Sequence, residues 1–271
     1  MRGTSQASLN AISDRFESDL QAAGQDALTI GEQLFVVVDA LDSSGALRRS
    51  LADPSRSGED KAALVRSVLS GGFDATTVSI MEAVAEAHWS SEADLVDAVS
   101  LLAINAHLVA AQMRGVLETV ESELFIVTRA LQGQREVRQA LSDDSTEPSR
   151  RVKLLEQLLT GRADPVTVAL ATRATAKPRG ERFVPALARV GDMAAARRSR
   201  KVAYVSTSHA LSDAQINRLE SLLTSAYGAD MQLNVTVDPA VVGGMRIQVG
   251  SDVIDSTMLT RLADAKRRLA S

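Results

Sequence analysis

Apolar residues in roughly the first 200 positions of the chain recur at the spacing of amphipathic helices. The first stripe consists of residues three or four positions apart: Leu9, Ile12, Phe16 and Leu20. A second helix is expected from about Ala27 to Leu41. Residues 98–112 are apolar nearly all round, and a helix of this kind must be covered on every side. The pattern therefore predicts a helical region that extends to about residue 201.

Beyond that region the hydrophobic period changes to that of strands. Val202–Thr207 is expected to form a strand, followed by a helix that begins with a capping box at Ser212. Apolar and polar residues then alternate through Met231–Val237 and Met245–Val249, as they do in strands with one buried face. A short strand and a terminal helix, from about Ser256 to Ala270, complete the pattern. The C-terminal part is thus predicted to be a small α+β domain.

The helical region contains an internal duplication at an offset of 90 residues. The segment Leu34–Leu41 (LFVVVDAL) returns as Leu124–Leu131 (LFIVTRAL). Further identical pairs at this offset are Arg48 and Arg138, Asp53 and Asp143, Leu69 and Leu159, Gly71 and Gly161, and Asp74 and Asp164. A repeat of this length indicates a duplicated structural unit, here a bundle of about six helices. Residues 98–112 form the last helix of the first copy and, by the offset, match its first helix. We therefore expect the two bundles to share this helix.

Together these patterns predict a mainly α fold with two tandem helical bundles and a small α+β C-terminal domain. We expect the first bundle at residues 1–112, with its last helix shared, and the second at residues 113–201. The α+β domain with its terminal helix is expected at residues 202–271. An aromatic content of only 3% also favours packed helices over an aromatic-rich sandwich.

Charge and composition exclude several classes of function. The net charge of −4 gives the chain no general attraction for nucleic acid. The basic run Arg197–Lys201 lacks the aromatic residues that stack on bases, so we interpret it as a solvated linker, or else as a site for an acidic protein surface. Without cysteine the chain forms neither a disulfide nor a thiolate metal site. No apolar run approaches the roughly 20 residues of a membrane helix, and the N-terminal residues are too polar for a signal peptide. We expect no membrane insertion, metal or cofactor.

The most specific string of the sequence lies between the predicted C-terminal strands. Asp238-Pro239 ends one strand, since proline donates no hydrogen bond to a sheet. Gly243-Gly244 permits a bend that side chains would not tolerate, and it leads into a strand rather than a helix, which disfavours a phosphate loop. A turn at Gly250 and a short strand ending at Asp255 follow. The order of these features closely resembles the C-terminal signature of the delta subunit of bacterial ATP synthases, a family that includes the mitochondrial oligomycin-sensitivity-conferring subunit.

The resemblance implies a non-catalytic stator protein rather than an enzyme. In this family the N-terminal bundle binds N-terminal helices of the alpha subunits at the top of the catalytic head. The C-terminal part holds the end of the b-subunit peripheral stalk, and the whole complex places such a protein at the cytoplasmic face of the cell membrane. Residues from about Met113 to Ser271, with the shared helix, would correspond to one complete delta subunit. The first bundle would then be an extra copy.

The resemblance also suggests which residues bind the partners. The alpha-subunit helix lies against the first and fifth helices of the family's bundle, which in the first copy are represented by Leu9, Ile12, Phe16, Val78 and Met81. In the second copy the same site would consist of the shared helix with Val168 and Leu170. Because the shared helix is expected to be covered, the first copy is the better candidate. On the terminal helix, the apolar face with Met258, Leu262 and Leu269 is expected to contact the b subunit, or else to pack on its own domain.

Two interpretations from other classes stay open at this point. A helical adaptor that binds amphipathic helices, unrelated to ATP synthase, would explain the repeat but would leave the C-terminal string a coincidence. A small-molecule enzyme would need a nucleophile with its base or a cluster of ligands, and the three scattered histidines offer no such set. The resemblance therefore favours the stator protein over both.

Overall fold

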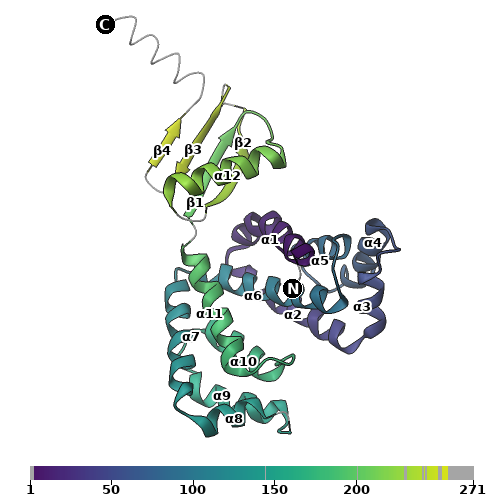
Figure 1. The fold of residues 1–271 in the computed structure, drawn as a ribbon, viewed down its shortest axis with the longest axis vertical. Coiled ribbons are helices and arrows are strands. Elements are labelled where there is room, and N and C mark those ends of the chain that lie inside the picture. The colour runs from purple at the N-terminus through teal and green to yellow at the C-terminus, as the bar shows by residue number, and fades with distance from the viewer. Residues whose placement is uncertain are drawn as a thin grey trace, which may run out of the picture. The chain divides into compact units, whose positions relative to one another are not determined.

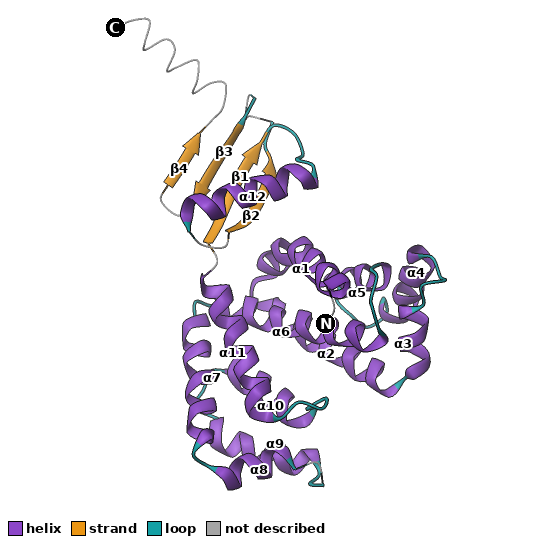
Figure 2. Cartoon of the chain, in the orientation of Figure 1, coloured by secondary structure: helices purple, strands orange, loops and turns teal. Residues whose placement is uncertain are grey.

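The computed structural model describes residues 3–143, 145–199, 201–228, 231–239, 241, 243–249 and 252–255. It confirms the predicted fold class, a mainly helical chain that ends in a small mixed sheet (Figures 1 and 2). The chain divides into two compact units, Met1–Ala195 and Ala196–Ser271. Apart from residues 196–201, both predicted helical bundles lie in the first unit, so the boundary between them at residue 112 stays a prediction.

The first unit contains two consecutive sets of helices. The first set comprises α1 (Gly3–Ala23), η1 (Gly24–Asp26), α2 (Ala27–Ser43), α3 (Gly45–Ala52), α4 (Gly58–Leu69), α5 (Ala75–Glu86) and α6 (Glu92–Met113). The second set comprises α7 (Leu117–Gln132), α8 (Arg135–Ser142), α9 (Pro148–Leu159), α10 (Pro165–Ala176) and α11 (Phe183–Ser199), whose end reaches the second unit. Counted from α6, the second set repeats the order of the first: α7 corresponds to α2, and α10 to α5.

The two sets repeat each other down to single hydrogen bonds. Gln33 Oε1 on α2 accepts a hydrogen bond from the backbone N–H of Asp74 at 2.8 Å, and another from a threonine hydroxyl on α5. At the positions 90 residues later, Glu123 Oε2 on α7 accepts a hydrogen bond from the backbone N–H of Asp164 at 2.9 Å, and again one from a threonine hydroxyl. The Gln33 oxygen thus ties α2 to the start of α5, and the Glu123 oxygen ties α7 to the start of α10. The duplication in the sequence is therefore also a duplication of structure.

Helix α6 is covered on all sides, as its sequence predicts. It packs against α1, α2, α3 and α5 of the first set and against α7 and α10 of the second. Leu102, Ile104 and Leu108 are buried, and Leu101 is half-buried. In the described part of the chain, α6 is the one helix long and apolar enough to cross a membrane, and 67% of its apolar window is buried inside the protein. The core helix of a bundle meets the same criterion, so packing accounts for its apolar surface.

Helices α2 and α6 cross closely at Gly31, because a Cβ atom there would overlap the imidazole ring of His107. The ring is buried, and its Nδ1 donates a hydrogen bond to the carbonyl oxygen of Ala103 at 2.8 Å. Burial lowers the pKa of His107, which keeps the ring neutral. The ring also contacts Phe35, with 5.2 Å between the two ring centroids. An aromatic pair and one glycine thus fix the crossing.

The second unit is a mixed sheet with one helix packed against it. Its elements are β1 (Lys201–Thr207), α12 (Asp213–Tyr227), β2 (Met231–Val237), β3 (Met245–Val249) and β4 (Asp252–Asp255). The strand order is β2-β1-β3-β4; β1 pairs parallel with β2 and antiparallel with β3, and β4 pairs antiparallel with β3. The core of the unit consists of Ala203, Val205, Leu223, Met231, Ile247 and Val249. The predicted strands and the helix after Ser212 are all present, and Gln215 accepts the hydrogen bond of the Ser212 backbone N–H.

The C-terminal signature residues serve the geometry of this sheet. The backbone N–H of Asp238 donates to the carbonyl oxygen of Thr207 at 2.8 Å, which joins the end of β2 to the end of β1. Gly243 and Gly244 have φ angles of 61° and 85°, in the left-handed region that favours glycine. These two residues therefore provide the predicted bend before β3. Asp255 ends β4, where it pairs in register with Arg246 of β3. Pro239 follows β2, and Gly250 lies outside the described residues.

Candidate functional site

The residues suggested for alpha-subunit binding lie together in the core of the first set of helices. Helix α1 packs on α5, and Leu9, Ile12, Phe16, Val78 and Met81 all belong to one hydrophobic cluster. Their exposed fractions run from 1% for Met81 to 9% for Val78. These side chains therefore stabilise the bundle and would support a binding surface from beneath. Direct contact with a partner helix would come from their exposed neighbours on α1 and α5.

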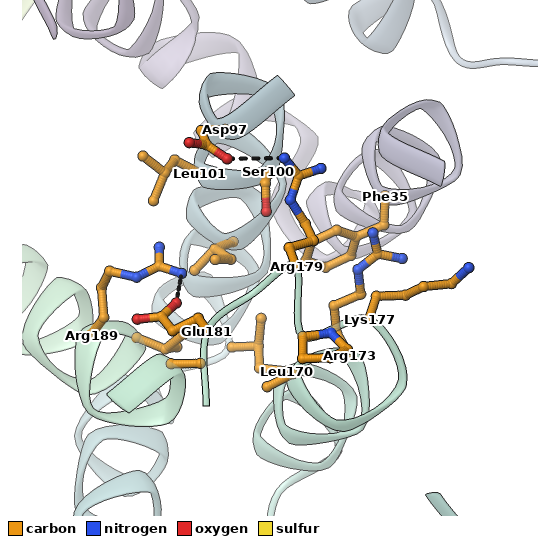
Figure 3. A pocket seen from close by; sticks show the side chains of 15 residues that line it. Phe35, Asp97, Ser100, Leu101, Leu170, Arg173, Lys177, Arg179, Glu181 and Arg189 are labelled. Carbon is orange, nitrogen blue, oxygen red and sulfur yellow. Dashed lines mark hydrogen bonds and ion pairs between the residues drawn. The ribbon is translucent and has the colours of Figure 1, made fainter. Parts of the chain in front are cut away.

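The equivalent place in the second set is a pocket of about 330 Å³ between the two sets (Figure 3). Ser100, Leu101 and Ile104 line it from α6, and Leu170 lines it from α10. Further lining residues come from α11, and Phe35 reaches the pocket from α2 of the first set. Leu170 is buried, and Val168, the other residue suggested on α10, is half-buried. The groove that would bind a partner helix is thus partly occupied by the neighbouring bundle.

Ion pairs cross this junction between the two sets. The guanidinium of Arg173 on α10 lies 2.8 Å from the Asp39 carboxylate on α2, and its Cζ lies 4.6 Å from the centroid of the Phe35 ring. Lys177 Nζ is 4.0 Å from the same carboxylate. A guanidinium over an aromatic face gains a cation–π attraction in addition to its charge pair. A basic strip on the second set therefore meets an acidic strip on the first.

Arg179 makes the most extensive of these contacts. Its Nη1 donates to both carboxylate oxygens of Asp42 on α2, at 2.8 and 2.7 Å. Its Nη2 donates to Asp97 on α6 at 2.9 Å, a contact drawn in Figure 3. Among the described residues, Arg179 is the one non-glycine residue with a positive φ, at 50°. Such a backbone costs roughly 1–2 kcal/mol for a residue with a Cβ, so the side chain's contacts offset a local strain.

Sequence reasoning did not identify this junction. Asp39 and Asp42 are three residues apart on α2, which places them on one helix face, and Lys177, the residue directly after α10, is four residues from Arg173. That spacing was a signal for two charged strips. It does not reveal that the strips face each other, because solvated helix faces carry the same spacing.

The structure does not place the residues suggested for b-subunit binding. Met258, Leu262 and Leu269 lie outside the described residues. In the rest of the chain that the structure describes, no group of three or more His, Cys, Asp or Glu side chains could hold a metal ion.

Comparison with known proteins identifies the family. The family model described as "ATP synthase delta (OSCP) subunit" matches residues 105–269. The ATP synthase subunit delta of Beutenbergia cavernae is 45% identical over 271 residues, which cover 100% of both chains. The namesake from Kineococcus radiotolerans is 42% identical and covers 99% of this chain and 97% of its own. A chain in the cryo-EM structure of the Toxoplasma gondii mitochondrial ATP synthase hexamer matches 62% of this chain and 95% of its own length, with 23% identity and a TM-score of 0.30.

The two kinds of match differ in where they begin. The family model starts inside α6, so α1 to α5 lie outside it. The relatives from Beutenbergia and Kineococcus align over nearly their whole length, including this first set of helices. The additional bundle is thus a feature that these relatives share, and an adaptor unrelated to ATP synthase is ruled out. The chain belongs to the ATP synthase delta (OSCP) subunit family.

Proposed function

We propose that this chain is a non-catalytic stator subunit of the proton-translocating ATP synthase, which links the alpha subunits at the top of the catalytic head to the b-type peripheral stalk. The observation that carries the proposal is the division of a delta-family chain into two compact units with different folds. A connector needs one surface for each of its two partners, and two units with separate cores can hold them independently. In this proposal the chain works at the cytoplasmic face of the membrane, as a peripheral part of the complex.

The alpha subunits bind the first bundle in this proposal. In the second bundle the equivalent groove is partly occupied by Phe35 and is bordered by the ion pairs of Arg173 and Arg179. Among the described residues, no helix of the second bundle makes more than marginal contact with α1 or α5 of the first bundle. We further propose that the two bundles and the α+β domain comprise residues 1–112, 113–201 and 202–271.

Hydrogen–deuterium exchange tests which bundle binds. A peptide with the N-terminal sequence of the organism's own alpha subunit is added to the full-length chain. The proposal expects slower exchange in α1 and α5. Slower exchange in α6 and α10 instead would assign the site to the second bundle and contradict this part of the proposal.

The b subunit binds the C-terminal region, with Met258, Leu262 and Leu269 as its apolar contacts. Contacts of a helix in a groove concentrate their energy in a few buried anchors, often about 2 kcal/mol or more each. Leu262→Asp should therefore weaken binding of a peptide from the C-terminal end of the b subunit at least tenfold, since ~1.4 kcal/mol is a factor of ten. Binding of the alpha peptide should stay unchanged.

Asp264→Asn is the matched control, because Asp264 falls on the opposite face of the same predicted helix. It should bind both peptides like the wild type, and circular dichroism should show that all variants fold. If Leu262→Asp weakens both peptides equally, or neither, the division of labour between the two units is wrong.

A non-catalytic role agrees with the chemistry of the pocket. Its Arg179 is paired with Asp42 and Asp97, and its Arg189 with Glu181 at 2.7 Å, so these cations neutralise neighbouring carboxylates rather than face an open reaction centre. The purified chain should hydrolyse no ATP. Hydrolysis that a point substitution in this chain abolishes would contradict the proposal.

A further inference from the structure

One surface of the second bundle is exposed, whereas the repeat-equivalent surface of the first bundle is covered. Phe35 on α2 and Phe125 on α7 occupy equivalent positions, 90 residues apart. Phe35 is 8% exposed, whereas Phe125 is 62% exposed. The neighbouring equivalent residues, Val36 and Ile126, are exposed to similar extents, 56% and 59%. Val37 and Val38 are also buried while Val127 and Thr128 are half-buried, so the second copy is more exposed here, and the largest difference is at the phenylalanine.

The helix that covers Phe35 shows how the phenylalanine face of this repeated helix binds a partner. Helix α10 of the next bundle places Arg173 over the ring, and the same guanidinium pairs with Asp39, one helical turn after Phe35. The face therefore binds a helix through an aromatic anchor and a charge one turn later. No third bundle follows in the described residues, so no helix packs over Phe125 on α7 as α10 packs over Phe35 on α2.

The exposed face of α7 forms a continuous stripe. Its members are four, three or one residue apart, which puts them on one side of a helix for more than two turns: Ser122, Phe125, Ile126, Arg129 and Ala130. Phe125 and Ile126 are adjacent exposed apolar side chains in this stripe, and contiguous exposed apolar surface is a feature of interaction sites. Phenylalanine is also scarce here, at five in the whole chain.

The charge one turn after the anchor is reversed between the two copies. Asp39 in the first bundle corresponds to Arg129 in the second, which is exposed. An arginine such as the one over Phe35 would be repelled at Arg129, so another basic helix does not fit. A carboxylate fits, because it would pair with Arg129 as Arg173 pairs with Asp39.

We propose that the face of α7 formed by Phe125, Ile126 and Arg129 is a docking site for an amphipathic helix of another protein of the ATP synthase. The bound helix places apolar side chains on Phe125 and Ile126 and a carboxylate against Arg129. This site is separate from the α1–α5 face and from the C-terminal region. It gives the second bundle a contact of its own in the complex, on a surface that the first bundle uses inside the chain.

Rebinding to depleted synthase tests the site with the full-length chain. Synthase stripped of this subunit is titrated with wild type, Phe125→Ser, Arg129→Glu and the control Val36→Ser. Val36 is the control for Phe125→Ser because it is an apolar side chain exposed to a similar extent, 56% against 62%, on the equivalent helix of the first bundle. Phe125→Ser and Arg129→Glu should each weaken rebinding at least tenfold, because anchors in such interfaces carry much of the affinity. Val36→Ser should rebind like the wild type. Since all three side chains are exposed, thermal stability should change little in each variant.

Photo-crosslinking identifies the occupant. Benzoylphenylalanine at position 125 of the assembled complex should crosslink to a helix of another protein in the complex, within one turn of an aspartate or glutamate. Changing that acid to lysine should restore the rebinding of Arg129→Glu. Rebinding of Phe125→Ser with wild-type affinity, a crosslink to a second copy of this chain, or no crosslink would each overturn the site. These outcomes leave the proposed stator role intact as long as the wild type rebinds, whereas failure of the wild type to rebind would contradict that role itself.

Discussion

Arg179 offers a quantitative test of how the two helical bundles are joined. Its guanidinium binds Asp42 through two hydrogen bonds and Asp97 through one, and the three side chains are 22%, 39% and 52% exposed. Pairs this accessible to water are each worth only about 0.2–1 kcal/mol. Because Nη1 donates to both carboxylate oxygens of Asp42, we expect the two ion pairs together to contribute about 1–2 kcal/mol to the free energy of unfolding. The positive φ of Arg179 opposes this gain by roughly 1–2 kcal/mol.

Two substitutions separate the side chain from the backbone. Arg179→Ala loses the ion pairs and keeps the strained backbone, so it should lower the free energy of unfolding by about 1–2 kcal/mol. Arg179→Gly loses the same pairs but adopts the positive φ without a Cβ penalty, so it should be more stable than Arg179→Ala by about 1 kcal/mol. Urea unfolding followed by circular dichroism measures both differences. Repeating the titration in salt identifies the ionic contribution to this difference. The Debye length falls to ~3 Å at 1 M salt, so the difference in free energy of unfolding between wild type and Arg179→Ala should shrink. An alanine variant as stable as the wild type, a gap that salt does not change, or a glycine variant less stable than the alanine variant would refute this reasoning.

Three further predictions concern helix α6 and its neighbours. Leu102→Asp should destabilise the chain by about 3–5 kcal/mol, because it buries an unpaired charge, and the exposed control Ala93→Asp should change little in the same urea titration. Gly31→Ala should cost roughly 1–3 kcal/mol, since its Cβ would overlap the ring of His107, and a melting temperature equal to that of wild type would show that the crossing is not tight. Burial lowers the pKa of His107 in the folded chain below its ordinary value of 6.5, so the folded state binds fewer protons than the unfolded state. The free energy of unfolding should therefore fall as the pH drops below about 6.5, and His107→Gln should lose that part of the pH dependence while His88→Gln keeps it.

Much of this fold could be predicted because its local signals agree with its packing. The repeat predicted two similar sets of helices, and the hydrogen bonds of Gln33 and Glu123 reproduce it. An all-round apolar helix has to be covered, and α6 is. Gly243 and Gly244 predicted a bend and adopt the backbone that requires glycine.

The sequence was less informative about surfaces, for a physical reason. The stripe of Leu9, Ile12 and Phe16 suited a partner and a core equally, because both demand apolar residues at helical spacing. In the structure this stripe is buried inside its own bundle. Likewise, the faces of Phe35 and Phe125 look alike in the sequence, and only the packing of the second bundle on the first tells them apart. The charged junction at Arg179 depends on residues distant in the chain, so no local pattern could reveal it.

The claim that one chain joins the head to the stalk is tested most directly by simultaneous binding. Full-length chain is mixed with two peptides from the same organism, one from the N-terminal end of the alpha subunit and one from the C-terminal end of the b subunit. The complexes are then weighed by native mass spectrometry. The account predicts a ternary complex that contains one chain with both peptides, each bound as tightly in the presence of the other as alone. Competition between the two peptides, or failure of either to bind the folded chain, would contradict it.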